Sequence, residues 1–281
     1  MTITAEYPAE SAKPELWSAQ NARIPWPLAV PAAIAVLLLV LPLAGLLVRT
    51  PWSRLTEVLL DDAALTALRL SLICASAATV ISVVFGVPLA WVLARSRARG
   101  VRVLRALVTL PLVLPPVVGG VALLLALGRR GLVGHYLGSW FGISIPFTTS
   151  AVIIAETFVA MPFLVISVEG ALRQASLGLE EAAATLGATR LAIFRRITLP
   201  LIGPSLVAGS VLCWARALGE FGATITFAGN LPGRTATMPL AVYIALERDP
   251  DAAIALSLVL LVVSVAALTL LRDRWIRGAA L

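Results

Sequence analysis

The 281-residue chain is poor in charge and in the side chains that most enzymes use for chemistry. Charged residues make up 13% of it and hydrophobic residues 59%, whereas a soluble domain is typically about a quarter charged. The chain has one histidine, His135, and two cysteines, Cys74 and Cys213, which both lie in apolar segments. The composition excludes an ordinary soluble domain, and the His and Cys residues suggest neither a metal site nor a disulfide. An integral membrane protein is predicted.

The chain also lacks an ATP-binding motif and a cluster of catalytic side chains, and each absence narrows the classes of protein to which it can belong. The chain contains no phosphate-binding loop of the GxxxxGK[ST] kind, so ATP is expected to be hydrolysed by another subunit. No cofactor is expected on this chain itself. A membrane enzyme would need a nucleophile, a base or a metal clustered near one interface, and a single histidine with two buried cysteines supplies no convincing set. The net charge of +7 is small beside the apolar bulk and gives no reason to expect a nucleic-acid partner.

The apolar residues fall into six segments that are candidates for crossing a bilayer. The predicted spans are 28–48, 65–94, 104–127, 149–172, 204–229 and 254–271. Residues 1–24 are polar and predict a short disordered cytoplasmic tail rather than a secretory signal. The predicted fold is therefore an all-α polytopic membrane protein, with one transmembrane domain over residues 25–281.

The third span is unusual because prolines and glycines interrupt it. The interrupting residues are Pro111, Pro115, Pro116, Gly119 and Gly120. A membrane helix tolerates such a break only where protein or a cavity covers the freed backbone groups. The break predicts either a kink that helps helix packing or a part of a transport pathway.

Lysine and arginine are distributed unequally between the two sides of the predicted membrane. If the N-terminus is cytoplasmic, the inner side carries Lys13, Arg23, Arg95, Arg97, Arg99, Arg102, Arg105, Arg173, Arg190, Arg195, Arg196, Arg272, Arg274 and Arg277. The outer side carries Arg49, Arg54, Arg129, Arg130, Arg234 and Arg248. Because positive charge accumulates on the cytoplasmic side of membrane proteins, both termini and the loop 178–200 are predicted to be cytoplasmic.

The loop 178–200 is a polar island in this apolar chain. Residues 180–186 are good helix formers, Gly187 permits a sharp reversal, and Thr189 can cap a second short helix that Pro200 is expected to end. The result is a helical hairpin with one apolar face, too short and too charged to cross a bilayer. On its composition alone, it fits a hairpin that lies against lipid headgroups.

The spacing within this loop resembles the signature of ABC-importer permeases. The pattern is Glu181-Ala182-Ala183, three residues, Gly187, nine residues, Ile197, one residue and Leu199-Pro200. In that family the loop forms the coupling helix, which sits in a cleft of a partner ATPase. The resemblance implies that Glu181, Ala182, Ala183, Gly187, Ile197, Leu199 and Pro200 couple this chain to such a partner.

The fifth span carries two charged residues, Arg216 and Glu220. With a helix that starts at Pro204, Arg216 lies about 18 Å along it, and Glu220 follows one turn later on the same face. Because an unpaired charge at that depth is costly, the two are expected to pair, with Glu156 of the fourth span as an alternative partner. The pair either helps an oxyanion to cross or works in a gate, or it is a structural link between two helices or two subunits. The neighbouring surface is small and mildly polar, with Gly219, Gly222, Thr224 and Thr226.

Three segments narrow the resemblance to the molybdate-permease branch of these importers. They are LPLVLPPVVGG at 110–120, ARALGEFGATITFAGN at 215–230 and TMPLAVYIALE at 237–247. The sulfate/thiosulfate branch is similar around residues 216–220 and departs over 223–227. The candidate pathway or gate residues are Arg216, Glu220, Thr224, Thr226, Glu156, Pro115 and Pro116.

The resemblance implies a permease subunit that imports molybdate or tungstate through a bacterial-type inner membrane. Its expected partners are a second copy of itself, a cytosolic ATPase dimer that holds ATP and magnesium, and an extracytoplasmic oxyanion-binding protein. One alternative is a sulfate/thiosulfate permease. Another is an ion-coupled secondary carrier, suggested by Glu156, Arg216 and Glu220, although a carrier has no use for the loop and the chain shows no internal repeat.

Overall fold

A computed structural model describes residues 26–278, with side chains for residues 26–269. The predicted tail, residues 1–24, lies outside the described residues. These described residues are almost entirely helical and include no strand, which confirms the predicted all-α fold. The chain divides into two units at Val48 and Arg49.

The first unit contributes helix α1 (Trp26–Arg49), where a span of 28–48 was predicted. Its 24 residues carry no charge before Arg49. At about 1.5 Å per residue the helix is about 36 Å long, enough to cross a hydrocarbon layer of about 30 Å.

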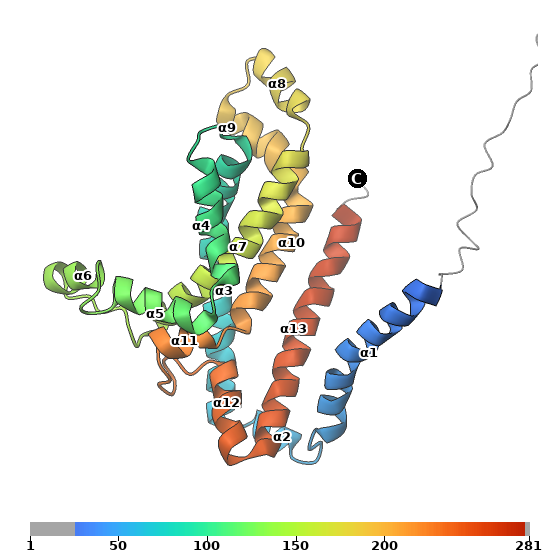
Figure 1. Cartoon of the computed structure of the whole chain (residues 1–281), viewed down its shortest axis with the longest axis vertical. Coiled ribbons are helices and arrows are strands. Elements are labelled where there is room, and N and C mark those ends of the chain that lie inside the picture. Colours follow the sequence, from blue (N-terminus) through green and yellow to red (C-terminus); the bar gives the residue numbers. More distant parts are fainter. Residues whose placement is uncertain (1–25, 279–281) are drawn as a thin grey trace, which may run out of the picture. The chain divides into compact units, whose positions relative to one another are not determined.

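The second unit contains the remaining helices (Figure 1). In chain order they are α2 (Leu55–Leu59), α3 (Asp62–Arg95), α4 (Val101–Val113), α5 (Pro116–Leu127), α6 (Gly134–Phe141), α7 (Thr149–Gln174), α8 (Leu177–Thr185), α9 (Arg190–Ile193), the π-helical turn η2 (Phe194–Thr198), α10 (Leu199–Leu218), α11 (Gly222–Phe227), α12 (Met238–Arg248) and α13 (Pro250–Gly278).

The core of the second unit lies where α3, α7 and α10 pack against one another (Figure 1). Small residues let these helices approach closely, and larger aliphatic side chains fill the space between them. Its buried residues include Ala75, Ala78, Ala90, Ala160, Ala217, Leu93, Leu164, Leu172, Ile202 and Leu218. Polar cross-links include two hydrogen bonds: the Ser167 hydroxyl donates to the Ser205 carbonyl at 3.1 Å, and the Trp214 indole donates to the Ser76 hydroxyl at 3.2 Å.

The predicted third span, 104–127, is not one membrane-crossing helix, and the count of six long spans is not reproduced. Five helical stretches in the described residues are long and apolar enough to cross. The third span is instead two helices, α4 and α5, of about 20 Å and 18 Å. Leu114 and Pro115 between them are extended, because each precedes a proline and is therefore pushed out of the helical region. Figure 1 shows α5 turned steeply away from α4.

The predicted fifth span, 204–229, also differs. Pro200 does not end the loop helix: α9, η2 and α10 form one continuous helical run from Arg190 to Leu218. A proline ring normally collides with the carbonyl four residues earlier. Here the π turn widens the backbone just before Pro200, so that the Leu199 N–H donates to the Phe194 carbonyl, five residues back. Pro204 lies inside α10 rather than in its first turn.

The far end of that span stops early. Helix α10 ends at Leu218, and the separate short helix α11 begins at Gly222. Glycine is a poor helix former, and Gly219 and Gly222 flank the break. The two loops predicted at 128–148 and 230–251 contain the helices α6 and α12. In Figure 1, α8 and α9 lie at one end of the unit, and the turn between α12 and α13 lies at the other.

Candidate functional site

The predicted coupling loop forms a helical hairpin, α8 followed by α9. Gly187 makes the reversal with a φ of +85°, a conformation that residues with a Cβ rarely adopt. The N–H groups of Gly187 and Ala188 return to the carbonyls of Ala184 and Ala183, which closes the end of α8. The Thr189 hydroxyl accepts from the Ala192 N–H at 3.3 Å, so Thr189 caps α9 as its sequence position predicted.

The predicted coupling residues divide into an outer and an inner group. Glu181, Ala182 and Gly187 are exposed at the hairpin, and Ala183 is half-buried. Ile197 and Leu199 are half-buried at its base, where Leu199 packs against the core, and Pro200 is exposed. The hairpin also exposes apolar side chains, most fully Leu186 at 88%. Exposed apolar side chains in a segment too short to cross a membrane are typical of a contact surface.

Glu180 anchors the hairpin to the transmembrane helices. One of its carboxylate oxygens, Oε1, accepts from Arg95 Nη2 at 2.8 Å and from Thr198 Oγ1 at 3.0 Å. Arg95 is the last residue of α3, and Thr198 is the last residue of η2. The side chains of Arg95 and Glu180 are only 15% and 20% exposed, so this ion pair is partly shielded from water. One carboxylate therefore joins α8, α3 and the base of α10.

A second cluster lies on the same turn of α3. Glu169 of α7 is buried, and its Oε1 accepts from the Nε atoms of Arg105 at 3.0 Å and of Arg173 at 2.9 Å. Both guanidinium groups also donate through Nη2 to the Leu93 carbonyl, at 3.2 and 3.3 Å. That carbonyl is in the last turn of α3, where helix carbonyls lack intrahelical partners. The cluster ties together the ends of α3, α4 and α7.

The two charged residues of the predicted fifth span meet at the break between α10 and α11. Arg216 Nη1 lies 2.6 Å from Glu220 Oε2, and Glu220 Oε1 accepts from the Ala223 N–H at 2.8 Å. The expected pairing is therefore present, although Glu220 lies beyond the end of the helix rather than one turn along it. Because α10 begins at Leu199 and not at Pro204 as predicted, Arg216 lies about 25 Å from the start of the helix and in its last turn. Glu220 is buried, while Arg216 retains partial exposure.

Helix α5 packs against α11 beside this break. A Cβ on Gly120 would lie 2.7 Å from the Cβ of Thr226 and 2.8 Å from the Ala223 carbonyl oxygen, so only glycine fits. Pro116, the first residue of α5, lies against Gly222, the first residue of α11. The structure thus places the two helices that follow a break, α5 and α11, side by side.

The remaining candidate pathway residues lie on or beside these helices: Glu156 and Thr224 are buried, Thr226 is half-buried and Pro115 is exposed. Glu156 on α7 is 1% exposed, its Oε2 has no hydrogen-bond partner among the described residues, and it lies within electrostatic reach of Glu220. In the described part of the chain, the ion pair of Arg216 is with Glu220 and none joins it to Glu156, so the alternative pairing is wrong. Thr224 is fully buried, and Thr226 Oγ1 donates to the Gly222 carbonyl at 2.8 Å.

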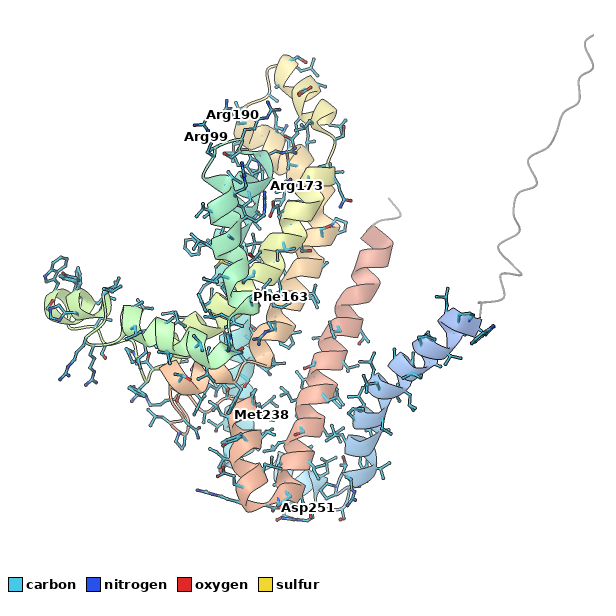
Figure 2. The ribbon with its side chains drawn as sticks, viewed as in Figure 1. Arg99, Phe163, Arg173, Arg190, Met238 and Asp251 are labelled. Atoms are coloured by element: carbon cyan, nitrogen blue, oxygen red, sulfur yellow. The ribbon has the colours of Figure 1, made fainter. Side chains whose placement is uncertain are left out.

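Several residues that organise the site were missed by the sequence reasoning. The sequence patterns assign three of them, Arg95, Arg105 and Arg173, only to the positive charge on the cytoplasmic side of the membrane. They assign Glu180 only a role as a helix-forming residue. Glu169 was not singled out, although an acid inside an apolar span, four residues before an arginine, is a signal of a helix-surface ion pair. Figure 2 shows Arg99, Arg173 and Arg190 at the end that carries α8 and α9.

The opposite end of the unit has its own ion pairs. Arg54 Nη2 lies 3.0 Å from Asp249 Oδ2, and Arg54 Nη1 lies 3.6 Å from Asp251, which Figure 2 labels at this end. The Ala252 backbone N–H and the Arg54 guanidinium hold the pKa of the Asp249 carboxyl below its usual value. A cavity of about 1140 Å³ opens nearby. Its lining includes Glu57, Asp61, Asp62, Asn230 and Arg248, and none of the predicted site residues.

Comparison with known proteins places this geometry in a family. A family model described as "Binding-protein-dependent transport system inner membrane component" matches residues 82–278. The Molybdenum transport system permease protein ModB of Mycobacterium bovis is 54% identical over 235 residues, 84% of this chain and 89% of that protein. The Sulfate transport system permease protein CysT of Salmonella typhimurium is 37% identical over 232 residues, 81% of this chain and 83% of that protein.

A solved structure has a similar fold. The crystal structure of a bacterial ABC transporter involved in the import of the acidic polysaccharide alginate superposes with a TM-score of 0.71 at 22% identity. The match covers 90% of this chain and 94% of the other chain. At that identity the likeness concerns the fold and not the cargo.

Proposed function

Because the chain belongs to the family of binding-protein-dependent transport system inner membrane components, we propose that it is the permease subunit of an ATP-driven molybdate importer. Membership makes it a transport component and not an enzyme. The observation that carries the cargo assignment is the 54% identity to a molybdenum permease, against 37% to a sulfate permease over a similar length. The tetrahedral dianion tungstate, which is close to molybdate in size, is included in the proposal.

The α8–α9 hairpin is the surface that docks on the partner ATPase. Its exposed residues Glu181, Ala182 and Gly187, with the exposed apolar side chain of Leu186, form the contact. The inner residues support this docking by holding the hairpin on α10. These residues are Ala183, Ile197, Leu199 and Pro200. Because η2 and α10 continue the hairpin without a break, a force on α9 acts directly on the transmembrane region.

The gate lies where α5 and α11 meet. Glu220 bonds to Arg216 of α10 through one oxygen and to the first turn of α11 through the other, so a change in the angle between these helices must break one of the two bonds. This supports a structural role for the pair within the gate rather than a binding site for the anion. Thr224 and Thr226 lie on α11, Glu156 is buried on α7, which packs against α11, and Pro115 and Pro116 set the start of α5.

The working importer contains two copies of this chain and two ATPase subunits, which bind ATP and magnesium. An extracytoplasmic oxyanion-binding protein delivers the cargo from the other side. The excess of arginine on one side supports a cytoplasmic position for both termini in a bacterial-type inner membrane. Arg99, Arg173 and Arg190 lie at the same end as the hairpin (Figure 2), which agrees with a hairpin that meets a cytosolic partner.

Uptake into proteoliposomes tests this function. The chain, its partner ATPase and its binding protein are reconstituted, and radiolabelled molybdate is followed with and without ATP. We expect ATP-dependent uptake that unlabelled molybdate and tungstate suppress and a tenfold excess of sulfate does not. Suppression by sulfate at equal concentration would favour a sulfate permease. Uptake without the ATPase, driven by an ion gradient, would favour a secondary carrier.

A further inference from the structure

We infer that Glu180 and Arg95 are positioning residues that carry the movement of the α8–α9 hairpin to α3, and that the Glu169 cluster passes it on to α4 and α7. The inference rests on the proposed docking of the hairpin on an ATPase. It concerns residues that do not form the docking surface, because Glu180 points inward while its neighbour Glu181 is exposed.

The first step is the link between α8 and α3. In α8, the side chain that hydrogen-bonds to another element of the described structure is that of Glu180. Its partners are Arg95 and Thr198. Hydrogen bonds between charged groups are short and about twice as strong as neutral ones. Partial burial strengthens the pair further, since water competes less for the two side chains. A displaced α8 therefore pulls on the last residue of α3.

The second step runs from Arg95 to the Glu169 cluster. Leu93, two residues before Arg95, offers the carbonyl that receives both Arg105 and Arg173. Glu169 holds the same two guanidinium groups through one oxygen. The end of α3 is thus bonded to α4 by Arg105 and to α7 by Arg173, so its movement reaches both helices.

The third step is the link from α4 to the proposed gate at α5 and α11. Arg105 lies near the start of α4, and the other end of this helix is the extended joint at Leu114 and Pro115. After that joint α5 packs on α11 with no room for a Cβ at Gly120. Helix α4, which contains Pro111, lies between the ion-pair cluster and the joint and therefore connects the hairpin with the proposed gate.

A double-mutant cycle tests whether the ion pair transmits movement. Glu180→Gln, Arg95→Gln and the double variant are reconstituted with the partner ATPase and binding protein, and the number of molybdate ions imported per ATP hydrolysed is measured. Arg97→Gln is the matched control, because Arg97 is exposed in the same segment and has no ion pair among the described residues. Co-purification of the ATPase with each variant reports on assembly.

We expect import per ATP to fall about tenfold in each single variant, as for the loss of a contacting charged pair, with ATPase activity and assembly retained. The double variant should be no worse than either single variant, and the exchange Arg95→Glu with Glu180→Arg should recover part of the ratio. The Arg97→Gln control should match the wild type. An import ratio unchanged in both single variants, or multiplied losses in the double variant, would overturn the inference. Loss of the ATPase from Glu180→Gln would also overturn it, because Glu180 would then be a docking residue.

A second pair of variants tests the later step in the same assay. Arg105→Gln removes a member of the Glu169 cluster, whereas Arg102→Gln changes an exposed arginine on the same helix. Only Arg105→Gln should lower import per ATP, and equal effects would refute the role of the cluster. The wild-type arm separates the two proposals: if the wild type imports no molybdate, the proposed function fails, whereas a failure confined to the variants concerns the ion pairs alone.

Discussion

Replacing Gly187 by alanine is expected to weaken the docking of the ATPase through the backbone rather than through a clash. Gly187 has a φ of +85°, and a Cβ built on it would meet nothing within 4 Å. The left-handed conformation costs a residue with a Cβ about 1–2 kcal/mol. A cost of that size lowers the population of the closed hairpin relative to open forms by a factor of about 5–30.

Three variants isolate this effect. Gly187→Ala should raise the dissociation constant of the detergent-solubilised chain for its ATPase by about 5–30-fold, if the closed hairpin is the form that docks. Gly187→Asn should raise it less, because asparagine adopts left-handed conformations more readily than alanine does. Gly203→Ala is the control, since Gly203 lies within α10 with open space around it. An affinity titration with purified ATPase checks all three.

The order of the dissociation constants of the three variants tests whether the left-handed conformation of Gly187 matters for docking. Wild-type affinity in Gly187→Ala would show that the left-handed reversal is not needed for docking. If asparagine is as harmful as alanine or worse, the larger side chain collides with the partner, and the conformational explanation is wrong. The far-ultraviolet circular dichroism of each variant should match the wild type, because one hairpin contributes little to the total helix content.

Further substitutions test the hairpin surface and the gate. Glu181→Lys should change the free energy of unfolding by less than about 0.5 kcal/mol, because the Glu181 side chain is exposed. The same variant should abolish ATP-driven uptake, and uptake at the wild-type level would argue against the docking surface. Gly120→Ala should lower the free energy of unfolding by about 1–3 kcal/mol in a thermal melt. Gly119→Ala should cost less, because its Cβ would meet side-chain atoms of Phe158 and Leu114, the nearest at 3.2 Å; similar melts would contradict the close packing. Glu220→Gln should lower the free energy of unfolding by about 1–3 kcal/mol, because it leaves Arg216 unpaired, although partly exposed. Adding Arg216→Met should restore much of this stability. If the double variant does not recover, loss of the ion pair is not the cause.

Much of the fold could be predicted because long apolar runs leave few alternatives. The run that predicted a span at 149–172 corresponds to α7, Thr149–Gln174, and the run at 65–94 corresponds to α3, Asp62–Arg95. Two consecutive prolines, Pro115 and Pro116, predicted an interruption in the third span, since each excludes the helical conformation from the residue before it.

The errors concern places where tertiary structure overrides a local rule. Pro200 commonly stops a helix, but a π turn immediately before it lets the chain continue. The stop at Leu218 depends on Glu220, whose carboxylate satisfies the Ala223 N–H of the next helix and so makes a break affordable. Gly219 and Gly222 are the local signal for this break, but a local pattern does not reveal the hydrogen bond by which a buried side chain stabilises it.

The missed ion pairs have a different origin. Glu180 and Arg95 are separated by 85 residues, and Arg105 and Glu169 by 64. Pairings over such distances depend on how α3, α4 and α7 pack, which a single sequence does not encode in any periodic pattern. For the second pair the available signal was Glu169, an acid within a predicted span, because charged residues at such depth commonly pair with one another.

The unbroken run from Arg190 to Leu218 also joins the hairpin to the proposed gate through one continuous helical backbone. Its 29 residues follow a path of about 43 Å at 1.5 Å per residue, and the π turn η2 divides this path into two parts. A π turn holds one residue more than an α-helical turn. Deleting one residue from η2 would therefore return the backbone before Pro200 to α-helical geometry, in which the proline ring collides with the carbonyl four residues earlier. The length of η2 is consequently as constrained as its composition.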